Sequence, residues 1–290
     1  MHPTILKNLK RVDKLVNDNI SKLDNGAPAP SWIELSPIDT CNRKCTFCPK
    51  SDDSIAPDQP FFMQPALYKK IAKELRESNF KGTIMLAGYG EPMLSPKIYD
   101  MISLFSEFCN VEITTNGDFL NDKTLKKLIS SGIDKIILSL YDGPEQLTQF
   151  NNLFSENEIS SDKFILRDRW YSEEEDFGLK LTNRGGTISF GTPIEVDACK
   201  PCYYPHYSMM VDWNGDVFLC PQDWNRRIRT GNLAFDTIFD VWDSKQLKRY
   251  RQSLAKGNRK LPPCNKCNAD GTLHGKEQEL IWREYYAPKK

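Results

Sequence analysis

Strand-like and helix-like segments alternate along residues 32–142, and this alternation constrains the fold more than any other feature of the chain. The short apolar runs WIELSP, TIMLAG, VEITT and KIILSLY read as strands. Between them, apolar residues recur every three or four positions, as at Leu67, Ile71 and Leu75, which is typical of helices. Such repetition predicts a parallel sheet with helical crossovers, whose functional residues lie at the carboxyl ends of the strands.

The strand–helix pattern extends to about residue 170. A helix near 145–153 and a strand in KFILRDRW allow five to six strand–helix units in all, which is too few for a closed barrel. We therefore predict an α/β protein built on a partial (β/α) TIM-like barrel over residues 32–190.

Segments of different character flank the predicted barrel. Residues 1–31 read as an amphipathic helix over 4–24 and a proline-rich linker, separated by Asn25-Gly26. Residues 191–290 begin with a hairpin pattern, MMVDWNGDVFLC, and continue with short helical segments. We predict that they form a small α+β domain.

The charge balance bounds the partners that the chain can have. Lys and Arg together number 39, as do Asp and Glu, so the net charge gives no reason to expect nucleic acid or an anionic membrane. No apolar stretch is long enough to span a membrane, and the N-terminal segment lacks the apolar core of a secretion signal. We therefore expect a cytoplasmic protein, whose nine cysteines are better suited to metal than to disulfides.

Three of these cysteines form one compact motif. Cys41, Cys45 and Cys48 follow the first predicted strand with Cys-x3-Cys-x2-Cys spacing. Three thiolates on one short loop can hold three irons of a four-iron cluster and leave the fourth iron open to another ligand. A zinc site would need a distant fourth ligand. Cys109 stands alone after an apolar helix face and reads as a buried small hydrophobe.

Five more cysteines lie in the last third of the chain. They are Cys199, Cys202, Cys220, Cys264 and Cys267. Cys264-x2-Cys267 is a tight chelating loop, and Cys220 ends a predicted hairpin strand. A zinc ribbon made by Cys199-x2-Cys202 and Cys264-x2-Cys267 is one alternative, but it leaves Cys220 without a role.

The first cysteine loop, with Phe47 just before its last cysteine, resembles the signature of the radical S-adenosylmethionine superfamily. Gly88-Tyr89-Gly90-Glu91-Pro92 resembles the family's Gly-Gly-Glu-Pro motif, although Tyr89 interrupts the pattern. Thr115-Asn116-Gly117 and Ser139 end the next two strands, as in the family. The cofactor-binding residues that the resemblance implies are Phe47, Gly88, Gly90, Glu91, Pro92, Thr115, Asn116 and Ser139.

The C-terminal cysteines, with the motif GNL before a helix that contains Trp242, resemble the SPASM/twitch extension of this superfamily. No cysteine follows Cys267, as in the shorter twitch form, which carries one auxiliary four-iron cluster. The family spacing favours Cys202 as the fourth ligand, with Cys199 as the alternative. The ligand set that this resemblance implies is Cys202, Cys220, Cys264 and Cys267.

The resemblance also implies a reaction. Radical S-adenosylmethionine enzymes reductively cleave this cofactor to a 5′-deoxyadenosyl radical, which abstracts a hydrogen atom from the substrate. The short extension resembles that of the 2-deoxy-scyllo-inosamine dehydrogenase-like members, which oxidise an aminocyclitol alcohol. The expected function is therefore dehydrogenation of a small polar, sugar- or aminocyclitol-like substrate, with flavodoxin or ferredoxin as reductant. Modification of a peptide or protein side chain, and a non-enzymatic metal-stapled binding protein, are the alternatives.

Two arginine-containing segments are candidates for contact with the substrate. Arg167, Asp168 and Arg169 come at the end of the last predicted barrel strand, where catalytic residues are common, although they could equally form a solvated edge. The sequence does not distinguish whether one of them or one of several tyrosines would act as a base. Arg184-Gly185-Gly186 could bind an anionic group or form a plain turn.

Overall fold

One eight-stranded sheet runs through the computed structural model, which describes residues 3–18, 20–23, 25–178, 182–189 and 195–288. The strands are β1 (Trp32–Leu35), β2 (Thr83–Leu86), β3 (Asn110–Thr115), β4 (Lys135–Leu140), β5 (Phe164–Asp168), β6 (Ser208–Val211), β7 (Asp216–Phe218) and β8 (Arg229–Asn232). Their order is β5-β4-β3-β2-β1-β6-β7-β8, and neighbours are parallel from β5 to β6. The last two pairings, β6–β7 and β7–β8, are antiparallel.

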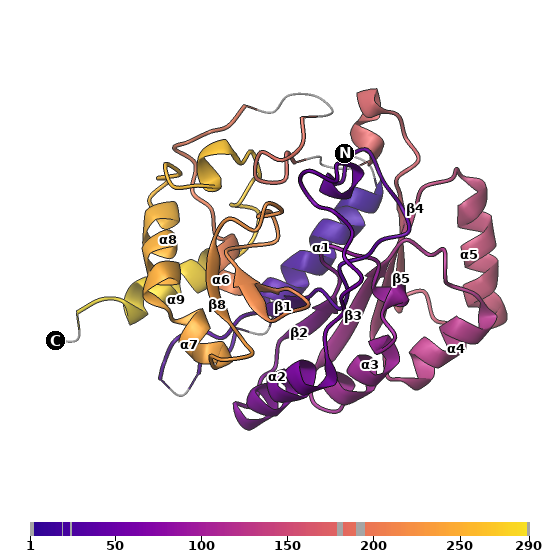
Figure 1. The fold of residues 1–290 in the computed structure, drawn as a ribbon, viewed down its shortest axis with the longest axis horizontal. Coiled ribbons are helices and arrows are strands. Elements are labelled where there is room, and N and C mark those ends of the chain that lie inside the picture. The colour runs from indigo at the N-terminus through magenta and orange to yellow at the C-terminus, as the bar shows by residue number, and fades with distance from the viewer. Residues whose placement is uncertain (1–2, 19, 24, 179–181, 190–194, 289–290) are drawn as a thin grey trace.

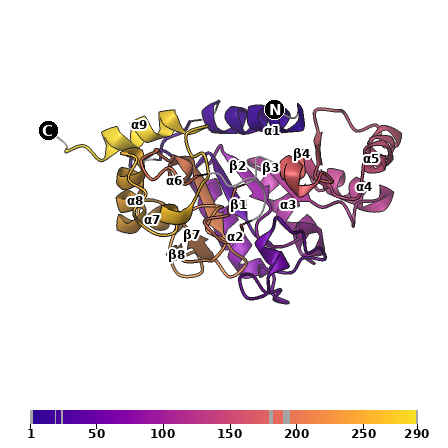
Figure 2. The same ribbon diagram turned by 90° about the horizontal axis from the view of Figure 1, so that it is seen from above.

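Helices follow the first four strands and cover one face of the sheet (Figure 1). They are α2 (Pro65–Glu77), α3 (Ile98–Ser106), α4 (Asp122–Ser130) and α5 (Glu145–Glu156). The helix α1 (Pro3–Asn17) lies on the opposite face, as Figure 2 shows. It contacts β5. The predicted partial (β/α) barrel is therefore confirmed, with its concave inner face beneath α1.

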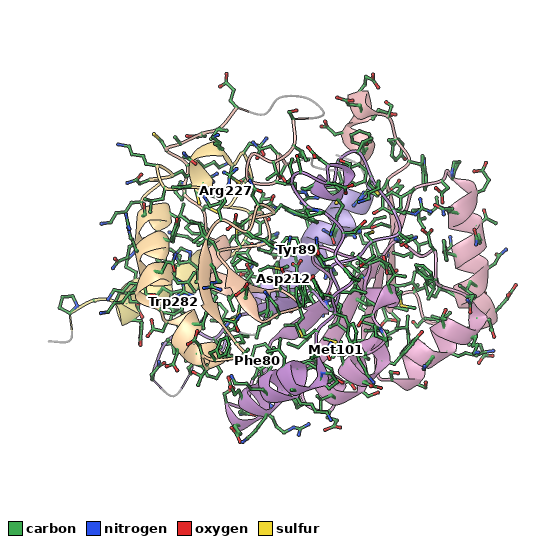
Figure 3. The ribbon with its side chains drawn as sticks, viewed as in Figure 1. Phe80, Tyr89, Met101, Asp212, Arg227 and Trp282 are labelled. Atoms are coloured by element: carbon green, nitrogen blue, oxygen red, sulfur yellow. The ribbon has the colours of Figure 1, made fainter. Side chains whose placement is uncertain are left out.

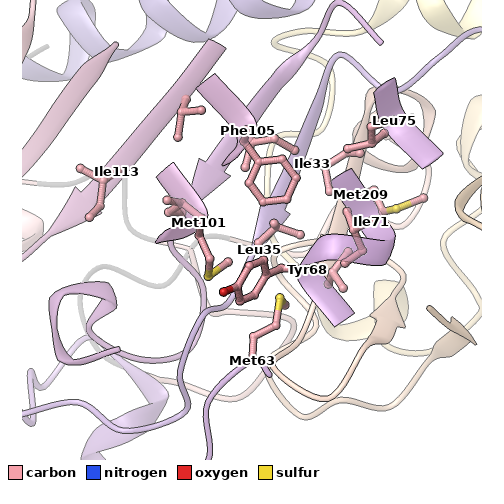
Figure 4. Close-up of a cluster of buried hydrophobic side chains, with 14 of the residues drawn as sticks. Ile33, Leu35, Met63, Tyr68, Ile71, Leu75, Met101, Phe105, Ile113 and Met209 are labelled. Carbon is pink, nitrogen blue, oxygen red and sulfur yellow. The ribbon is translucent and has the colours of Figure 1, made fainter. Parts of the chain in front are cut away.

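The side chains of each strand alternate between these two faces. On β1, Ile33 and Leu35 pack with Ile71 of α2 and Phe105 of α3 in the main hydrophobic core (Figure 4). Burial of each such side chain stabilises the fold by about 1.5–3 kcal/mol. Glu34 lies between them in sequence and faces the other way, into the space under α1. The outer face supplies the main core, whereas the inner face combines polar side chains such as Glu34 with a smaller apolar cluster that includes Trp32, Met85 and Val16 of α1.

The predicted N-terminal helix over 4–24 is shorter in the structure. It ends at Asn17, and the amide of Leu23 donates a hydrogen bond to the carbonyl of Ala27 across the turn at Asn25-Gly26. The apolar spacing continues to Leu23, but these tertiary and turn contacts replace the last predicted helical turn.

The C-terminal part of the chain extends the barrel sheet instead of packing beside it. β6 pairs in parallel with β1, and β6 and β7 form the hairpin predicted around Asn214-Gly215. The helices of this part are α6 (Tyr204–Tyr207), α7 (Ile238–Trp242), α8 (Lys245–Ala255) and α9 (Lys276–Tyr285). Among the described residues, no helix combines the length and the apolar character needed to cross a membrane.

Two buried aromatic residues, labelled in Figure 3, fix the C-terminal part against the barrel and against itself. The Tyr89 hydroxyl, after β2, donates a hydrogen bond of 3.2 Å to the carbonyl of Asp223. The indole of Trp282, on α9, donates to the carbonyl of His206 over 3.0 Å and packs against the guanidinium of Arg251. The loops after β2 and β7 are therefore held together, at the edge of the site described next.

Candidate active site

A cavity of about 300 Å³ opens at the carboxyl ends of the first four strands. Its walls come from the cysteine loop after β1 and from the segments after β2, β3 and β4. Of the cofactor-binding residues predicted from the sequence, the lining includes Phe47, Gly88, Gly90, Glu91, Thr115, Asn116 and Ser139. Pro92 is not among the lining residues and instead begins the 3₁₀ turn Pro92–Leu94. We call this space the cofactor pocket.

The three cysteines of the first motif line the same pocket. Cys41, Cys45 and Cys48 are half-buried. Burial raises the pKa of Cys41 to about 11 and that of Cys45 to about 12, and the charge of Cys48 raises both pKa values further. The three side chains line the same pocket, where they could serve as ligands of one cluster. Bound iron would offset these raised pKa values, because thiolates are its ligands.

Polar contacts attach the cysteine loop to the barrel. The Arg43 guanidinium forms ion pairs with Asp118 at 2.5 Å and Asp142 at 2.6 Å, after β3 and β4, and lies over the ring of Tyr141. On the other side, the amide of Cys41 donates to the carboxylate of Asp58 over 3.1 Å. The loop is therefore held at both ends, so its cysteines face the pocket.

Glu91 lies at the floor of the cofactor pocket and is 3 % exposed. Its carboxylate accepts hydrogen bonds from the Thr115 hydroxyl (2.7 Å), the Asn116 amide (2.8 Å) and the Met93 amide (3.0 Å). Burial raises the pKa of Glu91, and these hydrogen bonds act in the opposite direction. A carboxylate held in this way can accept a charge-assisted hydrogen bond from an ammonium group.

Gly90 allows the segment that carries Glu91 to approach the cysteine loop. A Cβ atom at position 90 would lie 2.6 Å from the carbonyl oxygen of Thr40, directly before Cys41. Only glycine fits this approach without moving one of the two loops. The interruption of the family motif at Tyr89 has a structural role, because that ring is buried against Trp224 at 4.8 Å.

A second cavity, of about 430 Å³, adjoins the cofactor pocket. Arg167, Arg184 and Gln222 line both spaces. Asn8 and Leu9 of α1 form part of its wall. We call this second space the central cavity, and a molecule bound in it would lie next to the cofactor pocket.

The three catalytic candidates, of which Arg167 and Asp168 end β5 and Arg169 follows it, do not face the same way. Arg167 and Arg169 line the central cavity, whereas Asp168 is on the other side of the strand and accepts a hydrogen bond from the Tyr171 hydroxyl. The Arg167 guanidinium donates to the Ser139 hydroxyl over 2.8 Å. Burial, and then the charge of Arg169, lower the pKa of Arg167 to about 9.

The C-terminal cysteines gather at the far wall of the central cavity. Cys202, Cys220, Cys264 and Cys267 line one small enclosed space, and each is buried or half-buried. Cys199 is exposed and is not among the residues of this lining. The small space and the central cavity share four lining residues, which are Tyr204, Gln222, Arg259 and Ala269.

Arg259 holds the loops that carry two of these cysteines. It is 2 % exposed and donates to the carbonyls of Lys200 (2.7 Å), Pro201 (3.0 Å) and Ala269 (3.0 Å). Cys202 therefore lies close to Cys267.

The four sulfurs offer the donor set of a four-iron cluster. No group of three or more His, Cys, Asp or Glu side chains in the described ranges is arranged to hold a single metal ion. The ligand assignments stay predictions from the motifs.

Glu34 and Tyr141 are among the residues of the cofactor pocket that were not anticipated from the sequence. Glu34, on β1, lines the pocket, and burial raises its pKa to about 7, although the charges of Arg184 and Arg11 act in the opposite direction. Tyr141 stacks on Phe47 with a centroid distance of 6.0 Å. A lone acidic residue in an otherwise apolar strand was the signal for Glu34, and the position directly after a strand was the signal for Tyr141.

Comparisons with known proteins agree with this arrangement. The family model described as the radical SAM superfamily matches residues 35–163, and the SPASM model, an iron–sulfur cluster-binding domain, matches residues 202–268. The second match begins at Cys202, so it leaves out Cys199.

Several relatives are similar to this chain. The S-adenosyl-L-methionine-dependent 2-deoxy-scyllo-inosamine dehydrogenase of Niallia circulans is 30% identical over 242 residues, which cover 82% of this chain and 92% of the relative. The GTP 3′,8-cyclase of Clostridium perfringens is 31% identical over 114 residues, which cover 38% of this chain and 34% of the relative.

Solved structures are similar over most of the chain. The crystal structure of BtrN in complex with AdoMet and 2-DOIA has 28% identity and a TM-score of 0.72, over 87% of this chain and 98% of that one. The structure of anSMEcpe with bound AdoMet has 14% identity and a TM-score of 0.52, over 88% of this chain and 96% of that one, and shares the fold. By sequence and by structure, this protein belongs to the radical S-adenosylmethionine superfamily, as an oxidoreductase that uses S-adenosylmethionine, a four-iron cluster and an auxiliary iron–sulfur centre.

Proposed function

We propose that this protein dehydrogenates an alcohol carbon of a small polar ring, sugar-like or aminocyclitol-like. The observation that carries the proposal is the central cavity, because it shares walls with the cofactor pocket on one side and with the C-terminal cysteines on the other. Its volume of about 430 Å³ suits a small molecule. The relative from Niallia circulans is named as a dehydrogenase of such a ring alcohol.

Oxidation of an alcohol to a ketone removes one hydrogen atom, one electron and one proton. With its cofactors bound, the enzyme takes the hydrogen atom by means of the 5′-deoxyadenosyl radical, and the auxiliary cluster can accept the electron. Cys41, Cys45 and Cys48 would hold the first cluster. Cys202, Cys220, Cys264 and Cys267 would hold the second, and the exposure of Cys199 argues against it as a ligand.

The remaining residues of the cofactor pocket would bind S-adenosylmethionine. Glu91 offers a carboxylate for its ammonium group, and Thr115 and Asn116 keep that carboxylate in place. Phe47 and Tyr141 offer stacked aromatic rings for its adenine. Ser139 lines the same pocket and is held by Arg167.

Arg167 is our candidate for the base that takes the hydroxyl proton. It lines both the cofactor pocket and the central cavity, and burial, followed by the charge of Arg169, lowers its pKa below the usual range of arginine. A base is more effective as its pKa comes nearer to the working pH. Asp168 points away from the cavity, and Arg169 is held by the carbonyls of Asp168 and Gly178, each at 2.7 Å.

The test uses anaerobically reconstituted enzyme with S-adenosylmethionine, a strong reductant and 2-deoxy-scyllo-inosamine deuterated at each carbinol carbon in turn. We expect 5′-deoxyadenosine and ketone in a 1:1 ratio, with deuterium in the deoxyadenosine for one labelled position only. Deoxyadenosine without ketone would contradict the proposal, and turnover of peptides instead of ring alcohols would favour side-chain modification.

Variants of Arg167 test the base. Arg167→Gln should lower kcat far more than it raises KM, and Arg167→Lys should restore part of kcat with a shifted pH profile. Arg249→Gln, at an exposed position of α8, is the matched control and should behave as the wild type. An unchanged kcat in Arg167→Gln would remove Arg167 from this role.

We also propose that a small reductant protein, flavodoxin or ferredoxin, supplies the electron, and that the enzyme works in the cytoplasm. The reducing conditions there suit free thiols and iron–sulfur clusters. Reduction of the reconstituted enzyme by flavodoxin and its reductase, followed by deoxyadenosine formation, would support the first part. Fluorescent fusions to the chain in its host would test the second.

A further inference from the structure

We propose that Arg184, together with Arg169, binds an anionic group of the substrate, so that the ring carries a carboxylate or a phosphate. This inference rests on the proposed function and names the class of ring that the enzyme would take. It starts from the position of Arg184, which lines both the cofactor pocket and the central cavity.

The Arg184 side chain has no counter-ion within the described part of the chain. No hydrogen bond or ion pair of its guanidinium is formed there, and its Nε atom is buried without a partner. The residue as a whole is half-buried, and within the described part of the chain its guanidinium keeps its donors free for an anion that enters the cavity.

The backbone holds Arg184 in an unfavourable conformation. Its φ is +48°, in the left-handed region that an arginine rarely adopts, and Gly185 and Gly186 follow with φ of +66° and +84°. Asn183 anchors the turn, because its amide donates to the side chain of Asn268 over 2.8 Å and its side chain donates to the carbonyl of Lys266 over 2.7 Å. A strained residue that the surrounding structure holds in place is a frequent feature of ligand sites.

The other charges at the central cavity leave an excess of positive charge. Its basic residues are Arg167, Arg169, Arg184, Lys200 and Arg259, and its acidic residues are Glu195, Asp197 and Asp270. Lys200 pairs with Asp270 at 3.1 Å. Arg259 is bound to backbone carbonyls, and Arg169 offers a ligand only the donors other than Nη1, which bonds to the carbonyls of Asp168 and Gly178. Glu195 and Asp197 are exposed.

Three arginines therefore share the inner end of the central cavity. The charges of Arg169 and Arg184 both lower the pKa of Arg167, which shows that the three guanidinium groups repel one another. Glu34 is the acidic group that faces Arg184 from the cofactor pocket, at a distance beyond that of an ion pair. An anionic substrate group between Arg184 and Arg169 would relieve the repulsion between these two cations and would orient the ring between the two cysteine sets, with Arg167 left to face the hydroxyl.

The test must distinguish anion binding by Arg184 from a second role, which is to balance the charge of the two cysteine sets. Its charge lowers the pKa of Cys48 in the first motif and of Cys267 in the second, so it could serve only to balance the thiolates of the two clusters. In that case Arg184→Gln would shift the reduction potentials of the clusters and would leave the binding of ring compounds unchanged.

The experiment measures binding to the holoenzyme with S-adenosylmethionine present, by anaerobic calorimetry. The probes are two matched pairs, myo-inositol 1-phosphate with myo-inositol and glucuronate with glucose. We expect the anionic member of at least one pair to bind about tenfold tighter or more, as a charged hydrogen bond allows. Arg184→Gln should reduce this preference to about twofold or less, Arg184→Lys should restore part of it, and Arg249→Gln should keep it.

Several outcomes would overturn the inference. They are equal binding of the anionic and neutral members, no binding of either anion, or an anion preference that survives Arg184→Gln. A redox titration of both clusters by electron paramagnetic resonance, on the same variants, identifies the charge-balancing role. The dehydrogenase proposal is judged separately, by ketone formation. If a neutral or amino ring gives ketone and no anion binds, only the proposed anion site is wrong. If an anion binds and no ring gives ketone, only the proposed dehydrogenase activity is wrong.

Discussion

The hydroxyl of Thr115, the last residue of β3, donates a hydrogen bond of 2.7 Å to the carboxylate of Glu91 in the loop after β2, at the floor of the cofactor pocket. These residues are 24 positions apart in the chain, and parallel pairing of β2 with β3 brings them together. The contact leaves the buried carboxylate with its position set by three donors and open to the pocket.

Glu91→Gln should weaken the binding of S-adenosylmethionine. The amide has no charge for the ammonium group of the cofactor, and a charge-assisted hydrogen bond contributes about 1.5–3 kcal/mol. We expect the dissociation constant to rise about tenfold to hundredfold, measured by equilibrium dialysis on reconstituted enzyme. Glu156→Gln, at an exposed position near the end of α5, is the control. Equal affinity in Glu91→Gln and wild type would show that Glu91 does not contact the cofactor.

Cys202→Ala and Cys199→Ala should differ in iron content. Cys202 lines the small space among the C-terminal cysteines, whereas Cys199 is exposed. With two four-iron clusters, Cys199→Ala should retain about eight irons per chain, and Cys202→Ala should retain about four. Iron and sulfide analysis after anaerobic reconstitution measures this, with the triple variant of Cys41, Cys45 and Cys48 as the reciprocal control. The opposite order of iron loss would make Cys199 the ligand.

Arg11→Met should destabilise the docking of α1. The Arg11 guanidinium forms a buried ion pair with Glu112 of β3, whose side chain is 5 % exposed. Removal of one partner leaves a buried charge, and such changes cost about 3 kcal/mol or more. Urea unfolding of anaerobic holoenzyme should show this loss. The double variant Arg11→Met/Glu112→Gln should recover much of it, and Lys10→Met, on the exposed side of α1, should have little effect. A double variant as unstable as Arg11→Met would argue against an unpaired charge as the cause.

Glu34→Gln should stabilise the protein in a pH-dependent way. Burial raises the pKa of Glu34 from 4.5 to about 7, so the folded state holds this proton more tightly than the unfolded state. The contribution of Glu34 to the free energy of unfolding of the wild type is therefore greatest below pH 4.5 and falls as the pH rises toward 7. Glu34→Gln has no carboxylate to ionise, so its free energy of unfolding should equal that of the wild type near pH 4.5. Above pH 7 it should exceed the wild-type value by at most about 3 kcal/mol.

Thermal unfolding of Glu34→Gln and wild type at a series of pH values measures this difference. Glu156→Gln should show no comparable trend, because its side chain is exposed. A constant difference between Glu34→Gln and wild type at all pH values would mean that the carboxylate does not titrate as described.

Local sequence patterns were enough to predict most elements. The apolar runs of β1–β4 and the helical spacing of α2 depend on interactions between residues close in the chain, and each appears where it was expected. The cysteine motif and Gly88-Tyr89-Gly90-Glu91-Pro92 are equally local, so their chemistry could be assigned from the sequence. The end of α1 was missed, because contacts formed by residues 20–29 replace its last predicted turn.

Tertiary structure alone decided which of these residues meet. The pattern of β5 alternates, but only the position of α1 and the concave side of the sheet turn Arg167 and Arg169 inward and Asp168 outward. Likewise, the fold brings Cys220, after β7, and Cys264 to one small space, whereas Cys199 is exposed. The sequence determined the elements and the donor types, because these depend on local periodicity and spacing. The fold determined the cavity between them, because it depends on packing among segments that are distant in the chain.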